Sequence, residues 1–414
     1  MVGLGYVGLP LAQEASRAGL NVIGLDRNQT VVDALNIGNS HVDDLSDADV
    51  AEMLGLGFVA TTDASILSSS DVAVICVPTP LSDGGGPDLA AVIGATEAIS
   101  EHLHRGMLVI LESTTYPGTT DEIVRPLLEQ GGLRAGTDFN LAFSPERIDP
   151  GNPNFGAKNT PKVVGGLSPE CTARAADFYR SFIETVVTTR GTREAEMAKL
   201  LENTYRHVNI ALVNEMARFC HDLQIDLWDV IAAASSKPFG FQAFYPGPGV
   251  GGHCIPIDPN YLSHNVQARL GYPFRFVELA QEINSNMPGY VVSRAQDLLN
   301  DRGLPLRGAR VLLLGVTYKP NIADQRESPA IAIAEKLLEK GSAVEYHDPY
   351  VEHWHALADV QRVDDLNEAL ATADLTILLQ NHSCYDVESM PGLTSTLFDT
   401  RGALGSDSAN AHRL

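Results

Sequence analysis

Residues 192–224 contain neither glycine nor proline, and this uninterrupted stretch strongly constrains the fold. It predicts one helix of many turns, because glycine raises the entropic cost of a helix and proline breaks its hydrogen bonds. On both sides of it, apolar strand patterns alternate with helical segments, which implies parallel sheets with helical crossovers. The predicted strands lie within 21–26, 71–80, 106–115, 308–320, 343–349, 373–383 and 395–402. We therefore expect an α/β chain with domains at 1–191, 192–300 (all-helical) and 301–414.

The composition is that of a globular chain, with 44% hydrophobic and 20% charged residues among 414. A formal net charge of −23 argues against nucleic acid or an anionic membrane as a partner. We find no run of 18 apolar residues and no basic-then-apolar start, so neither a membrane span nor secretion is expected. The cysteines are widely spaced and odd in number, which indicates reduced thiols and a cytoplasmic location rather than disulfides or zinc. They are Cys76, Cys171, Cys220, Cys254 and Cys384.

A glycine fingerprint opens the chain. Gly3, Gly5 and Gly8 have GxGxxG spacing at the start of a helical segment, and Asp26 ends the following strand. The glycines would allow a tight turn and a close approach to pyrophosphate at the helix N-terminus, and the carboxylate would bind the adenosine ribose. An acid here disfavours the 2′-phosphate of NADP, so NAD is the predicted cofactor. The predicted contacts include the neighbouring Tyr6, Val7 and Arg27.

The strand that normally precedes such a fingerprint is missing, because only Met1 and Val2 stand before Gly3. Two explanations are open: the start is truncated, or the sheet lacks a central strand. Either would weaken cofactor binding or stability.

Polar residues recur along one face of the long predicted helix. Lys199, Asn203 and Arg206 stand at i, i+4 and i+7. One interpretation is a solvated helix face. The other is a lysine and an amide that point into a cleft, where they would hold a developing alkoxide or a water.

Cys254 lies in PGPGVGGHCIPIDP, a segment too rich in glycine and proline for a strand or helix. The backbone there must be exposed or tightly turned. We therefore expect this thiol to be accessible.

Together these segments resemble the UDP-glucose/GDP-mannose dehydrogenase family. The similarity covers essentially the whole chain, in GLGYVGLP, CVPTP, ESTTYPGTT, FSPERIDPGN, AKLLENTYRHVNIALVNEMA, PGPGVGGHCIPIDP and GVTYKPNIADQRESPA. The family oxidises the C6 hydroxymethyl group of a nucleotide sugar to a carboxylate, using two NAD per sugar. The resemblance implies two Rossmann-like domains, the C-terminal one binding a UDP-sugar. It also implies that the central helical domain forms a homodimer or a higher homo-oligomer.

The resemblance assigns the first chemical steps to three residues. Cys254 matches the family's nucleophile, which adds to the intermediate aldehyde as a thiohemiacetal and is then oxidised to a thioester. Lys199 and Asn203 would hold the reacting C6 oxygen, and Lys199 would also lower the pKa of the thiol.

The resemblance also implies a role in hydrolysis of the thioester for three other residues. Asp258 and Thr114 would orient the catalytic water, and Glu146 of SPER matches the carboxylate implicated in hydrolysis. The remaining predicted substrate contacts are Arg147, Arg206, Phe244, Tyr245, Gly251 and Lys319; the remaining predicted cofactor contacts are Pro78, Thr79, Thr114 and Arg326. No metal is expected.

The variant GGHCIPID resembles the branch that acts on UDP-N-acetylhexosamines, and is most similar to the UDP-N-acetylglucosamine 6-dehydrogenases. An acetamido group needs an apolar wall for its methyl group. Phe239, Phe241, Phe244 and Tyr245 would form that wall, or else the packed core of an ordered loop. UDP-N-acetylmannosamine, UDP-N-acetylgalactosamine and UDP-glucose remain alternative substrates. A one-step hydroxy-acid dehydrogenase and an inactive nucleotide-binding dimer are more remote alternatives.

Overall fold

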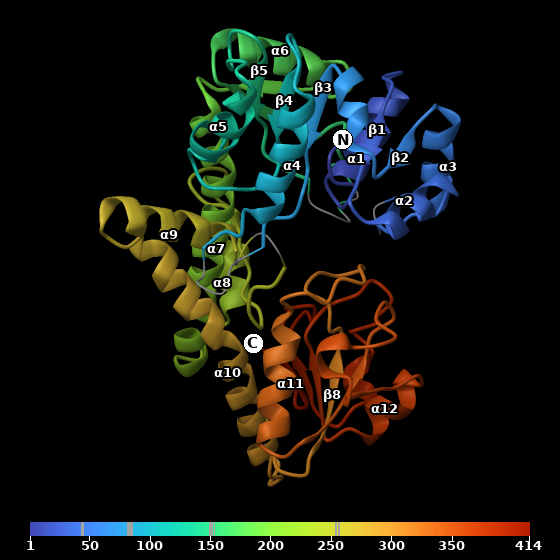
Figure 1. Ribbon diagram of the computed structural model, residues 1–414. Coiled ribbons are helices and arrows are strands. Elements are labelled where there is room, and N and C mark those ends of the chain that lie inside the picture. Colours follow the sequence, from blue (N-terminus) through green and yellow to red (C-terminus); the bar gives the residue numbers. More distant parts are fainter. Residues whose placement is uncertain (43–44, 81–85, 149–151, 153, 253–254, 256) are drawn as a thin grey trace. The chain divides into compact units, whose positions relative to one another are not determined.

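The computed structural model describes residues 1–42, 45–80, 86–148, 152, 154–252, 255 and 257–414. The chain divides into two compact units. The first contains Met1–Glu202 and Asn260–Tyr272, and the second contains Asn203–Pro259 and Pro273–Leu414. Two helices contribute residues to both units, namely α7 (Thr192–Asp222) and α9 (Asp258–Leu270) (Figure 1).

The sheet of the first unit is continuous through the segment before the fingerprint. Val2 forms parallel bridges to Leu25 on one side and to Ile75 on the other. Its backbone N–H donates to Val74 at 2.8 Å, and its C=O accepts from the N–H of Cys76 at 2.7 Å. The alternative in which the sheet lacks its central strand is therefore wrong, because residues 1–3 fill that position.

The strand order of this sheet is β2–β1, then residues 1–3, then β3–β4–β5–β6–β7. Among the described strands the pairs are parallel except β5 with β6, which are antiparallel and so depart from the all-parallel expectation. The strands are β1 (Ile23–Leu25), β2 (Val59–Thr61), β3 (Val72–Ile75), β4 (Leu108–Leu111), β5 (Asn140–Phe143), β6 (Lys162–Gly166) and β7 (Val186–Thr188).

Helices cover both faces of this sheet. Strand residues alternate between the faces, so Leu108 and Ile110 pack in one core with α1 and α6, while Val109 and Leu111 pack in another with α4 and α5. Such double burial explains the continuous apolar runs of these strands. The helices are α1 (Gly8–Arg17), α2 (Gln29–Asn36), α3 (Asp47–Gly55), α4 (Ala90–His102), α5 (Arg125–Leu128) and α6 (Pro169–Arg180), with short helical segments η1 (Ala64–Ser69), η2 (Thr120–Val124) and η3 (Glu129–Gly131).

The second unit contains a parallel sheet in the order β10–β9–β8–β11–β12–β13. One core lies between this sheet and helices α10 and α11, and another lies against α12. Its strands are β8 (Arg310–Leu314), β9 (Ala343–His347), β10 (Gln361–Arg362), β11 (Leu375–Leu378), β12 (Leu397–Asp399) and β13 (Ala411–Arg413). Its helices include α8 (Leu227–Ser235), α10 (Arg275–Asp301), α11 (Pro329–Glu339) and α12 (Leu366–Thr372), with η4 (His355–Leu357) and η5 (Met390–Gly392).

The long helix predicted over residues 192–224 is confirmed as α7, which ends at Asp222. The helix breaks where Gln224 adopts a positive φ of 58°, a conformation that ends α-helical hydrogen bonding. None of the described helices is long and apolar enough to cross a membrane.

Candidate functional site

The fingerprint forms a close turn between the sheet and α1. Gly3 has φ of 93°, and a Cβ added at Gly8 would lie 2.0 Å from the carbonyl oxygen of Gly3. A Cβ at Gly5, by contrast, would meet no atom within 4 Å. Gly3 and Gly8 are therefore needed for the turn itself, whereas Gly5 faces open space where a pyrophosphate fits. No described side chain caps the N-terminus of α1, which leaves its positive end available to an anion.

Asp26 closes the turn from the neighbouring strand. One carboxylate oxygen accepts the N–H of Leu4 at 2.9 Å, and the other accepts the N–H of Asn28 at 2.9 Å. Each oxygen keeps a lone pair, so the carboxylate is able to receive ribose hydroxyls as well. The residues present therefore fit a dinucleotide.

Two further predicted residues meet at the carboxyl ends of β3 and β4. The hydroxyl of Thr79 donates to the carbonyl oxygen of Thr114 at 2.7 Å, which ties the CVPTP loop to the ESTT loop. Pro78 precedes Thr79 and is exposed. In open α/β sheets, ligands bind at this edge. Of the other predicted cofactor contacts, Tyr6 and Arg27 are exposed and Val7 is half-buried.

The polar stripe on α7 is not a solvated face at its first two positions. Lys199 and Asn203 are 7% and 5% exposed, although Arg206 is exposed. The buried polar positions continue instead at His207 and Asn214, which are 1% and 0% exposed. Burial of so many polar groups on one helix requires partners, because an unpaired buried polar group is costly.

Asn203 finds its partner in Asp258. The amide nitrogen of Asn203 donates to a carboxylate oxygen of Asp258 at 2.5 Å, and Asp258 is 2% exposed. Asp258 begins α9, so the helix positions its carboxylate at the end of the cysteine segment. The structure thus brings together two predicted catalytic residues that lie 55 positions apart. Cys254 itself lies outside the described residues.

The first half of the cysteine segment is fixed by buried amides. The side chain of Asn214 accepts the N–H of Gly247 at 2.9 Å and donates to Asn284 of α10 at 2.9 Å. A Cβ at Gly251 would lie 2.5 Å from the carbonyl oxygen of Glu327 and 2.8 Å from the Cβ of Tyr318. Tyr318 and the predicted substrate contact Gly251 therefore pack against each other without room for a side chain at position 251.

Lys319 and Arg326, the two predicted cationic contacts of the second unit, differ in exposure and in their hydrogen-bond partners. Lys319 is half-buried next to Tyr318, and its carbonyl oxygen accepts the hydroxyl of Thr317 at 2.8 Å. Arg326 is exposed and its guanidinium pairs with Asp324 at 2.8 and 2.5 Å. An anion at Arg326 would have to compete with that carboxylate.

The aromatic residues near the cysteine segment do not act as a set. Phe244 packs with the core between α7 and α8 and contacts the ring of Tyr205. Tyr245 stacks on Trp228 but remains 55% exposed, and Phe239 and Phe241 are exposed in the single chain. The packed-core interpretation therefore fits Phe244 alone.

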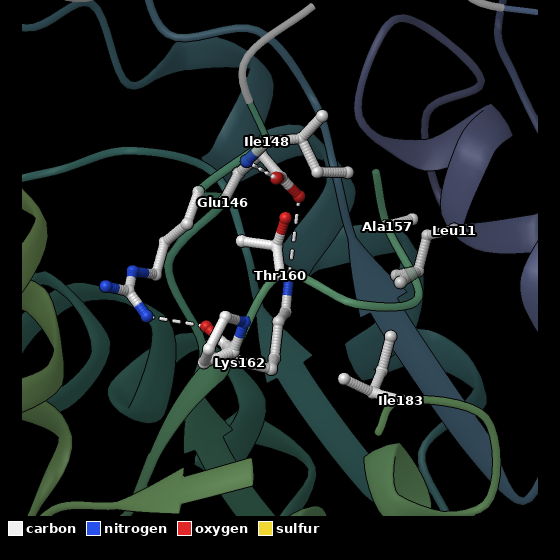
Figure 2. Close-up of a pocket in the computed structure, with 9 residues that line it drawn as sticks. Leu11, Glu146, Ile148, Ala157, Thr160, Lys162 and Ile183 are labelled. Carbon is white, nitrogen blue, oxygen red and sulfur yellow. Dashed lines mark hydrogen bonds and ion pairs between the residues drawn. The ribbon is translucent and has the colours of Figure 1, made fainter. Parts of the chain in front are cut away.

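Glu146 belongs to a buried cluster that we did not predict from sequence. One of its carboxylate oxygens accepts the N–H of Ile148 at 2.5 Å, and the other lies 3.4 Å from the ammonium group of Lys162. Lys162 is in turn 2.9 Å from Glu112. Figure 2 shows Glu146 and Lys162 pointing toward each other in a pocket of the first unit.

Arg147 points elsewhere. Its guanidinium forms an ion pair with Glu202 at 2.8 Å and donates to the carbonyl oxygen of Pro161 at 2.5 Å. Within its unit this side chain secures the SPER segment, and its predicted contact with the substrate remains a prediction.

Sequence reasoning missed Lys162, Glu112, His207, Asn214 and Asn284. One signal was available for the helical residues. His207 and Asn214 follow Asn203 at the spacings that keep one face of a helix, inside an otherwise apolar pattern. No such signal exists for Glu112 and Lys162, because only the sheet brings their strands together.

Comparison with known proteins decides the family. Three domains of one family match: the NAD binding domain over residues 1–183, the central domain over 193–286 and the UDP binding domain over 312–406. The chain belongs to the UDP-glucose/GDP-mannose dehydrogenase family. It is therefore an NAD-dependent nucleotide-sugar dehydrogenase, and the predicted family, fold class, enzyme class and cofactor are confirmed.

Several relatives in this dehydrogenase family are similar over most of their length. UDP-N-acetyl-D-mannosamine dehydrogenase of Escherichia coli is 35% identical over 94% of this chain and 94% of its own. UDP-N-acetyl-D-glucosamine 6-dehydrogenase of Pseudomonas aeruginosa is 39% identical over 85% and 82%. The solved UDP-N-acetylmannosamine dehydrogenase of Pyrococcus horikoshii superposes with a TM-score of 0.89 at 33% identity, covering 100% and 97% of the two chains.

Proposed function

We propose that the protein oxidises the C6 hydroxymethyl group of a UDP-N-acetylhexosamine to a carboxylate through a thioester on Cys254. The observation that carries this proposal is the buried hydrogen bond between Asn203 and Asp258. It joins the helix that bears Lys199 to the residue that closes the cysteine segment. A one-step hydroxy-acid oxidation has no need of such a segment, nor of a UDP binding domain.

When bound, NAD supplies the hydride acceptor for both oxidations. Lys199 and Asn203 hold the C6 oxygen, because an ammonium and an amide N–H both stabilise a developing alkoxide. The thiolate of Cys254 adds to the aldehyde carbon and forms the thiohemiacetal. Retention of the aldehyde on sulfur prevents its escape before the second oxidation.

Hydrolysis completes the reaction. Asp258 and Thr114 orient a water whose oxygen bonds to the thioester carbon. The carbon–sulfur bond breaks, sulfur leaves with the bonding pair, and the acid is released as carboxylate. Glu146 accepts one proton of the water, which requires its carboxylate to be ionised and directed at that water.

We propose UDP-N-acetylglucosamine as the substrate, with UDP-N-acetylmannosamine as the second candidate. The relative named for the glucosamine derivative is 39% identical, whereas relatives named for the mannosamine derivative are similar at 35% over a larger share of this chain. The exposed Tyr245 and the half-buried Lys319 and Gly251 are the proposed substrate contacts of the second unit.

We also propose a homodimer in a reducing compartment, the cytoplasm, with the domain divisions at 191/192 and 300/301. Large apolar side chains remain exposed along one face of α7 in the single chain, as an unpaired helix interface requires. The cysteines among the described residues are all free thiols: Cys76, Cys171, Cys220 and Cys384.

The test is the number of NADH formed per sugar consumed. UDP-N-acetylglucosamine, its manno and galacto epimers and UDP-glucose are supplied separately to the wild-type protein and to Cys254→Ser. We expect two NADH per acetamido sugar from the wild type. We expect slow or no release of acid from Cys254→Ser, with sugar retained on the protein as an ester.

Two results would contradict the proposal. Normal turnover by Cys254→Ser would exclude the thiol mechanism. One NADH per sugar would leave an aldehyde as product and remove the need for hydrolysis.

A further inference from the structure

The first unit buries a lysine between two carboxylates. The side chain of Lys162 is 7% exposed, and its ammonium lies 2.9 Å from Glu112 and 3.4 Å from Glu146. The hydroxyl of Tyr179 on α6 donates to the other oxygen of Glu112. The result is an ordered series of contacts, Tyr179–Glu112–Lys162–Glu146.

The series leads from the core toward the surface. Glu112 is 0% exposed and Tyr179 is fully buried, whereas the side chain of Glu146 is 12% exposed and lines a pocket. Glu146 is thus the outermost carboxylate of the series and the one able to meet water. Both of its oxygens have fixed donors on the protein, Ile148 for one and Lys162 for the other.

Stability alone is a weak reason for such a cluster. Desolvation of buried charges is expensive, and replacement by apolar residues of similar volume is often neutral or stabilising. The charges here are strongly coupled: burial alone would lower the pKa of Lys162, but Glu112 and Glu146 raise it above its ordinary value. Burial raises the pKa of Glu112, Lys162 opposes that rise and Glu146 adds to it.

Arg147 also lines the pocket, but its guanidinium pairs with Glu202 at 2.8 Å. Cys76 follows β3, and burial raises the pKa of its thiol well above the ordinary value. Burial and Glu112 likewise raise the pKa of Tyr179. Lys162 is therefore the cation that faces Glu146 within this cluster.

We propose that Lys162, held by Glu112 and Tyr179, is a positioning residue that keeps the carboxylate of Glu146 oriented for thioester hydrolysis. The inference rests on the proposed function, because it assigns Lys162 a part only in the last step. The two oxidations precede that step and do not require this lysine.

Rapid mixing of enzyme, NAD and UDP-sugar separates the steps. Two NADH per site form before hydrolysis, so a hydrolysis defect leaves this burst intact and slows only later turnover. We expect Glu146→Gln and Lys162→Met each to keep the burst, to lower the steady-state rate about a hundredfold and to accumulate a covalent sugar adduct detectable by intact-protein mass. Combining the two substitutions should add little further loss, because residues that act through one step are not additive.

Conservative variants serve as matched controls. Lys162→Arg retains the cation and should recover most of the steady-state rate. Tyr179→Phe removes a single hydroxyl and should slow turnover by about threefold after an unchanged burst, in line with the loss of one hydrogen bond. Tyr179→Phe keeps the test informative even if Lys162→Met fails to fold.

The outcomes distinguish this inference from the function on which it rests. A burst and an adduct in Glu146→Gln, with wild-type turnover in both Lys162→Met and Tyr179→Phe, would overturn the role of Lys162 alone. Loss of burst and turnover in equal proportion in the Lys162 and Tyr179 variants would show a structural role and overturn it too. Absence of any adduct in Glu146→Gln, with one NADH per sugar in the wild type, would overturn the thioester proposal and this inference with it.

Discussion

Gly8 and Gly5 of the fingerprint are required for different physical reasons: Gly8 for the backbone turn itself, and Gly5 for the approach of the cofactor. In Gly8→Ala the new Cβ would lie 2.0 Å from the carbonyl oxygen of Gly3, so the backbone must shift. We expect the free energy of unfolding to fall by about 1–3 kcal/mol, the usual cost of overpacking. Urea unfolding of the protein without ligand measures this change.

Gly5→Ala is the matched control, because its Cβ would meet no atom within 4 Å. Its unfolding free energy should stay within about 0.5 kcal/mol of the wild type. NAD affinity, measured by calorimetry, should nevertheless fall by about tenfold or more, since the pyrophosphate must approach this backbone. Unchanged NAD affinity in Gly5→Ala would show that the cofactor does not lie against Gly5.

At the scale of elements, α7 is joined to α10 by buried polar side chains. The amide nitrogen of Asn284 lies 3.2 Å from the carbonyl oxygen of His207 and 3.4 Å from its ring nitrogen Nδ1. The other ring nitrogen of His207 is buried without a partner among the described residues. Burial lowers the pKa of His207 to about 4.

This histidine makes stability depend on pH. Between the folded pKa of about 4 and the ordinary value of 6.5, the unfolded chain binds more protons than the folded one, so stability falls as the pH falls. The loss from this one group reaches about 1 kcal/mol at pH 5.5. We expect His207→Phe to lose less unfolding free energy than the wild type between pH 7.5 and 5.5, by about that amount. Identical pH slopes for the two proteins in urea unfolding would contradict a buried neutral His207.

At the scale of the whole molecule, one face of α7 carries large apolar side chains that remain exposed among the described residues of the single chain. Tyr205, Leu212 and Phe219 recur every seven residues on α7 and are 45%, 54% and 46% exposed, and Leu223, just past the end of the helix, is 65% exposed. If this face pairs two copies, Leu212→Asp with Phe219→Asp should convert the dimer to a 44.4 kDa monomer, because a carboxylate buried in an apolar interface is unpaired. Sedimentation velocity at micromolar protein measures the mass.

Leu338→Asp is the control for this experiment. Leu338 is also a large apolar residue on a helix, α11, and is 42% exposed. It should leave the mass unchanged. A monomeric wild-type protein would contradict the dimer, and a dimeric double variant would place the interface on another face.

Much of the fold could be predicted from local pattern. The strands β3, β4, β8 and β11 are mostly apolar runs long enough to recognise, β9 alternates apolar and polar residues, and α7 is marked by the absence of glycine and proline. The strands β1 and β12 were also anticipated, whereas β2, β5, β6, β7, β10 and β13 were not. Most of those missed are short, and the antiparallel pairing of β5 with β6 is a property of two distant segments rather than of either one.

The sequence by itself determined the family and the cofactor and supplied the candidate site residues, because motifs such as GxGxxG act through residues close together along the chain. Only the tertiary structure decided that residues 1–3 complete the sheet, that Asn203 meets Asp258, and that Lys162 lies between Glu112 and Glu146. The contacts of Lys162 with Glu146 and Glu112 join residues 16 and 50 positions apart, and the contact of Asn203 with Asp258 joins residues 55 positions apart. Their formation depends on which strands and helices become neighbours, and that is set by burial of the whole apolar core rather than by any local pattern.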